Sequence, residues 1–114
     1  MRSMTNSQNM SADILNYIGL AARARKVATG ETALKAIQSK KASFVIIASD
    51  ASDNTKKKFK NMTTYRSVPY QELGTKETLG HQLGRSERSS ISIEDQGFAQ
   101  AMIKYIDGGN VNVR

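Results

Sequence analysis

The feature that most constrains the fold of this chain is a continuous apolar run from Phe44 to Ala48, in which Val45, Ile46 and Ile47 are all β-branched. β-branched side chains favour a pleated strand. A strand that is apolar at every position must be covered on both faces, as happens in the middle of α/β sheets with helices on each side. The run therefore predicts an α/β fold with this segment as a central strand.

The segments on either side alternate between helical and extended patterns. Helical spacing predicts helices over about residues 12–26, 30–39, 54–61, 75–83 and 95–106. Alternation of polar and apolar residues predicts a strand at 90–93. A second short strand is expected within 66–73, and Pro69 favours an edge position for it in the sheet. Residues 27–28 are interpreted as a short extended link. No internal repeat or linker divides the chain. We therefore expect a single-domain, three-layer α/β/α sandwich with a small mixed sheet, spanning residues 11–109.

The two ends of the sequence differ from this core in composition. Residues 1–10 are polar and lack the apolar stretch of a signal peptide, so we expect a disordered leader or a cloning remnant; residues 110–114 are expected to be a flexible tail. No apolar run approaches the roughly 18 residues that a membrane span requires. These patterns predict a cytoplasmic protein without membrane partners.

The absence of cysteine and the presence of one histidine, His81, exclude several kinds of chemistry. A disulfide scaffold, a thiol nucleophile and a thiolate metal site all need cysteine, and the usual zinc and copper sites need more than one histidine. We expect no cofactor and no metal. His81 lies among polar neighbours and is interpreted as a surface residue rather than a catalytic one.

The positive charge of the chain is concentrated in one third of its length. The formal net charge is +7, and residues 23–60 hold ten basic and three acidic side chains, which already accounts for that excess. A localised positive field is typical of proteins that bind polyanions. A basic surface kept for solubility is the alternative. Nucleic acid is the favoured partner because no strongly amphipathic basic helix of the membrane-binding kind is present.

A first candidate binding segment is Thr29-Gly30-Glu31-Thr32, with Lys35 following one helical turn later. Glycine at a helix start permits close approach of another backbone, and the unpaired N–H groups there attract anionic oxygens. Thr32 and Lys35 would project on one side, beside Glu31. The alternative is an ordinary capped helix in which Glu31 pairs with Lys35. The spacing does not match a Walker A phosphate-binding loop.

A second candidate binding segment is the polar loop from Arg85 to Ser90. Arg85, Arg88, Ser89 and Ser90 supply guanidinium and hydroxyl groups suited to phosphates, ribose hydroxyls or base edges. A mobile surface loop is the alternative. In an alternating α/β fold, loops distant in sequence can converge at one sheet edge, which favours the two segments acting together. Arg23, Arg25 and Lys26 are further candidates for phosphate contacts.

Two other groups of residues suggest rival functions. Asp50 and Asp53 follow the central strand, where a carboxylate pair would suit magnesium in a small phosphate-handling enzyme, although loop and cap roles are favoured. The lysine run from Lys56 to Lys60 is interpreted as a solvated helix face with Phe59 turned inward. That face would also suit a protein–protein adaptor that docks acidic partners.

The same segments, taken in order, carry a family resemblance. The strings TGETALKAI, SFVIIASDAS, VPYQELGTKETLGHQLGR and SSISIEDQGF resemble the kink-turn-binding ribosomal protein superfamily (L-seven-Ae and L-thirty-e). The opening ILNYIGLAARARKVATGE is especially similar to a small bacterial member, and the match extends from about Ile14 to Ile106. The resemblance implies an α/β/α sandwich that binds structured RNA, typically a kink-turn with tandem G·A pairs.

The resemblance also assigns roles to both segments. Thr29, Gly30, Glu31, Thr32 and Lys35 correspond to the family surface that reads the G·A pairs, and residues 85–90 correspond to the loop that grips a flipped-out nucleotide. The sequence departs from the family in two places. It has Glu31-Thr32 where archaeal members carry Asn-Glu, and its second loop is charged and one residue shorter. The leading hypothesis is a non-catalytic, monomeric RNA-binding protein in a ribosome-associated or other ribonucleoprotein setting.

Overall fold

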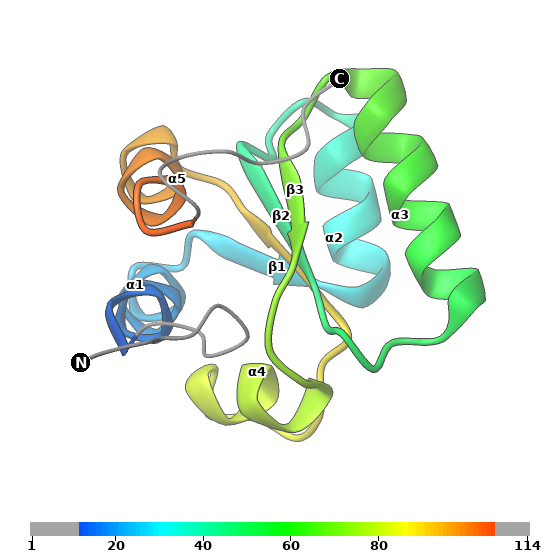
Figure 1. Ribbon diagram of the computed structural model, residues 1–114. Helices are drawn as coiled ribbons and strands as arrows, with labels where there is room; N and C mark the ends of the chain where they lie inside the picture. The colour runs from blue at the N-terminus through cyan, green and yellow to red at the C-terminus, as the bar shows by residue number, and fades with distance from the viewer. Residues whose placement is uncertain (1–11, 107–114) are drawn as a thin grey trace.

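The computed structural model describes residues 12–106; the expected leader at 1–10 and tail at 110–114 lie outside the described residues. Within this range nine elements follow one another along the chain (Figure 1). Their bounds are α1 Ala12–Arg23, β1 Val27–Thr29, α2 Gly30–Gln38, β2 Phe44–Ile47, α3 Asp53–Arg66, β3 Tyr70–Glu72, α4 Lys76–Gln82, β4 Ser90–Ile93 and α5 Gln96–Ile103.

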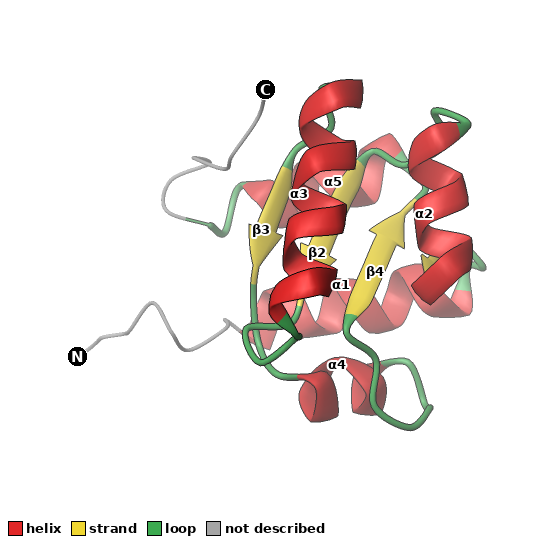
Figure 2. Ribbon diagram, turned by 90° about the vertical axis from the view of Figure 1, so that its right-hand side faces the viewer, coloured by secondary structure: helices red, strands yellow, loops and turns green. Residues whose placement is uncertain are grey.

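The four strands form one mixed sheet in the order β1-β4-β2-β3. β4 runs antiparallel to both β1 and β2, and β2 runs parallel to β3, so β1, β2 and β3 all point the same way. The carboxyl ends of these three strands therefore lie at one edge of the sheet together with the start of β4. α2 and α3 cover one face, while α1 and α5 cover the other (Figures 1 and 2). This arrangement confirms the expected three-layer sandwich.

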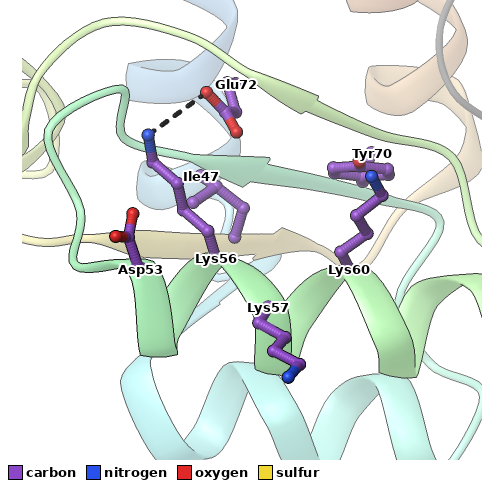
Figure 3. Close-up of a pocket in the computed structure, with 7 residues that line it drawn as sticks. All are labelled: Ile47, Asp53, Lys56, Lys57, Lys60, Tyr70 and Glu72. Atoms are coloured by element: carbon purple, nitrogen blue, oxygen red, sulfur yellow. Dashed lines mark ion pairs between the residues drawn. The ribbon is translucent and has the colours of Figure 1, made fainter.

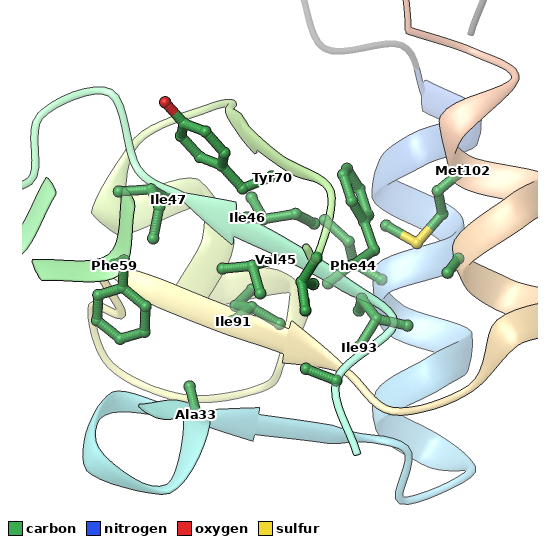
Figure 4. Close-up of a cluster of buried hydrophobic side chains, with 14 of the residues drawn as sticks. Ala33, Phe44, Val45, Ile46, Ile47, Phe59, Tyr70, Ile91, Ile93 and Met102 are labelled. Atoms are coloured by element: carbon green, nitrogen blue, oxygen red, sulfur yellow. The ribbon is translucent and has the colours of Figure 1, made fainter. Parts of the chain in front are cut away.

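The central strands β2 and β4 divide their side chains between the two helical layers. Phe44 lies opposite Ile93 and Ile46 opposite Ile91, on the face toward α1 and α5. These four side chains are fully buried and form the middle of the apolar core, with Met102 of α5 against them (Figure 4). The expected burial of β2 on both faces is confirmed.

The other face of β4 presents Ser90 and Ser92 to α2. Both serines are buried, and the Ser92 hydroxyl donates a 3.0 Å hydrogen bond to the Ala33 carbonyl oxygen in α2. The alternating pattern at 90–93 therefore does not reflect a solvent-exposed face. The serines are inside because small side chains allow α2 to pack close to the sheet, and their hydroxyls pair with α2 backbone.

Four expected boundaries were wrong. α1 ends at Arg23 rather than residue 26, because Arg25 has a left-handed φ of 62° that does not continue a helix. Residues 27–29 form the edge strand β1 instead of a link, because their backbone groups pair with β4. α3 continues to Arg66 rather than residue 61, since buried Phe59 and Thr63 lie one turn apart and extend its inner face. α5 ends at Ile103, before the expected end at residue 106. The predicted edge position of the Pro69 segment is confirmed by β3.

Candidate nucleic-acid interface

The two candidate segments meet at the sheet edge where β1 ends and β4 begins. Thr29, the last residue of β1, lies opposite Ile91 of β4, so the first turn of α2 adjoins the loop that precedes β4. The backbone N–H of Gly30 donates a 3.2 Å hydrogen bond to the Ser90 hydroxyl oxygen. Segments 60 residues apart in the sequence are thereby joined at one edge, as expected from the topology.

Gly30 makes the sharp turn from β1 into α2. Its φ is +57°, a left-handed value that side chains disfavour, and an added Cβ would meet no atom within 4 Å. Glycine is therefore needed here for its backbone conformation, and within the described residues no other segment comes close to the position that a Cβ would take. The open space beside it leaves the turn accessible to a ligand.

The first turns of α2 present polar groups to solvent. Glu31, Thr32 and Lys35 are exposed, and Thr29 is half-buried at the N-cap position. The Thr29 side chain makes no capping hydrogen bond, and no ion pair joins Glu31 to Lys35 in the part of the chain that is described. Both features of the ordinary capped-helix alternative are thus missing. The N–H groups and partial positive charge of this helix end can attract an anion.

Ser90 has a different place from the one expected. It is the first residue of β4 and is 1% exposed, with its hydroxyl turned to Gly30. The hydroxyl is thus turned into the protein at the Gly30 turn, and the expected direct contact of Ser90 with RNA stays a prediction. Arg85 is exposed, whereas Arg88 and Ser89 are half-buried.

The loop at 84–89 is held in shape by contacts with α4. The N–H of Arg85 donates to the Gly80 carbonyl (2.9 Å), and the N–H of Arg88 donates to the Lys76 carbonyl (3.1 Å). The Arg88 guanidinium donates to the carbonyls of Ser86 and Glu87, which folds it back over its own loop. Lys76 was not singled out from the sequence. Its proximity to this loop follows only from the fold.

A pocket of about 220 Å³ connects the two segments. Thr29 and Thr32 line it from the β1–α2 side and Arg85 lines it from the second loop. A neighbouring pocket of about 450 Å³ includes Arg23, His81 and Gly84. Arg23 is therefore close to the second loop. His81 is exposed, which confirms its interpretation as a surface residue.

The structure does not bring Arg25 and Lys26 to this edge. They precede β1, and the Lys26 carbonyl accepts from the N–H of Glu94, just beyond the far end of β4. At about 3.3 Å per strand residue, Lys26 lies roughly 13 Å along the strand from Gly30. These two residues belong to the opposite edge of the sheet.

The carboxylates considered for metal chemistry have structural surroundings. Asp50 accepts a 2.9 Å hydrogen bond from the backbone N–H of Lys76 at the start of α4. Asp53 is the first residue of α3, which Ser52 caps. Among residues 12–106 no group of three or more His, Asp or Glu side chains is placed to hold a metal ion, and no helix in that range could cross a membrane. The favoured loop and cap roles are confirmed for Asp50.

The three-layer fold and its two adjoining loops can be compared with those of known protein families. Residues 12–103 match the ribosomal protein L7Ae/L30e/S12e/Gadd45 family, and the chain belongs to it. The resemblance expected from the sequence is confirmed.

Individual relatives narrow the position within this family. The RNA-binding protein YlxQ of Bacillus subtilis (strain 168) is 40% identical over 91 residues, covering 79% of this chain and 91% of the relative. YlxQ of Enterococcus faecium is 42% identical over 95 residues, covering 82% and 91%. A solved structure of a protein of unknown function from Bacillus halodurans C has a TM-score of 0.82 at 38% identity, covering 85% of this chain and 99% of that one. The Giardia lamblia 15.5kD RNA binding protein has a TM-score of 0.73 at 28% identity, covering 90% and 91%.

Proposed function

We propose that this protein binds structured RNA without catalysing a reaction, and that its ligand contains a kink-turn or a similar bulged element. The observation that carries the proposal is the Gly30–Ser90 hydrogen bond, which joins two polar loops into one exposed edge. The RNA-binding proteins that this chain is similar to support an RNA ligand. We further propose that the protein acts as a monomer within a cytoplasmic ribonucleoprotein.

The proposed contacts divide between the two segments. Backbone N–H groups at the start of α2, with Thr32 and Lys35, would contact base edges and phosphates, while Glu31 would accept hydrogen bonds from base amino groups. Arg85 would close over the opposite side, with Arg88 and Ser89 behind it. Loops that hold unstacked bases suit bulged RNA better than a regular duplex.

The decisive experiment compares three labelled nucleic acids by fluorescence anisotropy at fixed salt. One is a kink-turn RNA, the second is the same RNA with its G·A pairs converted to Watson–Crick pairs, and the third is duplex DNA. We expect a preference of about 10³-fold or more for the intact element, the lower end of typical specificity ratios. Equal, weak and steeply salt-dependent binding to all three would contradict the proposal, because the positive charge alone would then account for it.

Replacing Lys35 by alanine should weaken binding of the kink-turn RNA and lower the slope of log K against log salt by about one unit. The reason is the loss of one lysine–phosphate contact and of the counterion that it releases. The measurement is the same titration at several salt concentrations. Lys26→Ala, on the opposite sheet edge, is the control. A slope that is equal for wild type and Lys35→Ala would remove Lys35 from the interface.

Ser90→Ala and Ser92→Ala form a matched pair of variants. Each removes one buried hydroxyl from β4 and one hydrogen bond to α2, so each should lower the free energy of unfolding by about 1 kcal/mol. Only Ser90 holds the Gly30 turn, and we expect only Ser90→Ala to weaken RNA binding, several-fold. Chemical denaturation and RNA titration of both variants test this. Equal losses of RNA affinity would show that Ser90 contributes stability alone.

A further inference from the structure

The positively charged side chains of α3 take no part in the RNA interface proposed above. Lys57, Lys58 and Lys60 are exposed, and we call these three residues the α3 lysine surface. No ion pair involves them in the described part of the chain. Lys56 differs, because its ammonium lies 3.5 Å from a Glu72 carboxylate oxygen on β3. α3 therefore carries three lysines whose charge is not neutralised locally.

The side chains around α3 show which way this charge is presented. A pocket of about 290 Å³ lies between α3 and β3, and Asp53 and Glu72 contribute carboxylates to it. Lys56 and Lys60 point toward β3, whereas Lys57 points away from it (Figure 3). Lys56, Lys57 and Lys60 line the same pocket, so the charges of its carboxylates are largely offset there. An anionic ligand would therefore lie across the outer surface of α3, opposite buried Phe59. Lys57 and Lys58 are exposed there, and Lys60 borders the surface from the β3 side (Figure 3).

The position of α3 relates this charge to the proposed RNA interface. α3 packs beside α2, and both helices begin at the same edge of the sheet (Figures 1 and 2). Packed helices have axes about 8–10 Å apart. A duplex arm that leaves the first turn of α2 on the α3 side would therefore extend over α3.

We propose that the α3 lysine surface is a second, sequence-independent binding surface for the phosphate backbone of an RNA duplex arm that extends from the element held at Gly30. This inference rests on the proposed RNA-binding function. Lysine is a flexible point charge, which suits phosphates that need neutralising and carry no sequence information. The duplex arm is bound by attraction to its backbone, and the loops at Gly30 and Arg85 supply the recognition of its bulged part.

The chemistry of this surface favours RNA over an acidic protein. The cores of protein–protein interfaces are depleted in lysine and enriched in aromatic and other apolar anchors. On α3 the exposed large hydrophobic residue is Tyr65, near the far end of the helix from Gly30. Three lysines without an adjacent apolar anchor match a phosphate backbone better than a folded protein partner.

The test uses the variant Lys57→Ala/Lys58→Ala and two forms of the kink-turn RNA. In the short form both arms are trimmed. The long form is made in two versions, each with one of the two arms lengthened by about one helical turn, roughly 10 bp. For the wild type we expect tighter binding when one of the arms is lengthened. For the double variant we expect that gain to disappear, with about a tenfold loss of affinity for the long RNA and a salt slope lower by about two units. Binding of the trimmed RNA should be unchanged.

Lys104→Glu is the matched control, because it lowers the net charge by the same two units. Lys104 is exposed and lies at the C-terminal end of α5, on the other side of the sheet from α3. It should retain the gain from the longer arm. A double variant that also retains the gain overturns the inference. The inference is also overturned if the double variant binds both RNAs like the wild type but no longer binds polyglutamate. The α3 lysine surface would then bind an acidic polypeptide.

The same titrations separate this inference from the proposed function. If the wild type binds intact and G·A-converted RNAs equally, kink-turn recognition fails. The α3 lysine surface still predicts that the double variant, and not Lys104→Glu, binds plain duplex RNA about tenfold more weakly. If that duplex binding is unchanged, the inference fails as well.

Discussion

Replacing Gly80 by alanine should destabilise the protein by about 1–3 kcal/mol and weaken RNA binding at the same time. Gly80 is buried in α4, directly beneath the loop at 84–89. A Cβ at this position would overlap the carbonyl oxygen of Ser86 and lie 2.7 Å from its carbonyl carbon. Because backbone, and not a flexible side chain, lies in the way, the loop itself must move. Arg85 and its neighbours would then lose their position opposite α2.

Gly19→Ala provides the matched control for Gly80→Ala, because both glycines lie in the middle of helices. A Cβ at Gly19 would have ordinary contacts of 3.6–3.7 Å with Gln82 and Arg23. We expect this variant to be unchanged or stabilised by about 0.5–1 kcal/mol, the usual advantage of alanine in a helix. Thermal unfolding and RNA titration of both proteins are the measurements. A Gly80→Ala protein with wild-type stability and affinity would show that α4 does not set the shape of the loop.

Replacing Phe44 by alanine should lower the free energy of unfolding by about 3–5 kcal/mol, the largest effect that we expect from a single substitution. Phe44 is 0% exposed on the central strand β2, within the cluster that includes Ile93 and Met102. The closely packed helices on that face cannot collapse fully into the space, so the variant loses the transfer free energy of the ring and retains a cavity. Urea unfolding, followed by far-ultraviolet circular dichroism, measures the change.

Leu20→Ala is the comparison for Phe44→Ala. Leu20 is 43% exposed on α1, and its truncation should change stability by about 0.5 kcal/mol or less. At a temperature where the Phe44→Ala protein remains folded, its RNA affinity should be that of the wild type, because Phe44 lies on the sheet face away from α2. A similar loss of stability for both variants would mean that the core is not organised around β2.

The layers of the fold could be predicted from the sequence because each rests on a local pattern. The unbroken apolar run at 44–48 required cover on both faces, and that cover is present. The last helix was expected to begin at residue 95, and the Asp95 carboxylate accepts from the N–H of Phe98 at the N-cap of α5. The edge strand β1 could not be predicted in the same way. Three residues carry too little pattern, and their pairing depends on β4, more than 60 positions later.

The candidate site shows a similar division. The two segments and their convergence could be predicted, since the order of strands and helices places such loops at one edge. The different positions that neighbouring basic residues take in the fold could not be predicted. Arg23 lies near the second loop, whereas Lys26 lies at the opposite edge, and only the course of the chain through the turn after α1 separates them. The inward orientation of Ser90 also depends on its partner in α2, which no local pattern identifies.

The position of β4 in the sheet has a consequence for the newly made chain. β4 lies between β1 and β2, so β1 has no strand partner until residues 90–93 have been synthesised. Pairing over such long sequence separations makes the closing of a sheet slow compared with the forming of helices. Ser90 belongs to that same late strand, and without it the Gly30 turn lacks its hydrogen-bond partner. A nascent chain that has not yet reached β4 thus lacks both a closed sheet and a shaped ligand edge, and the addition of residues 90–93 allows both to form.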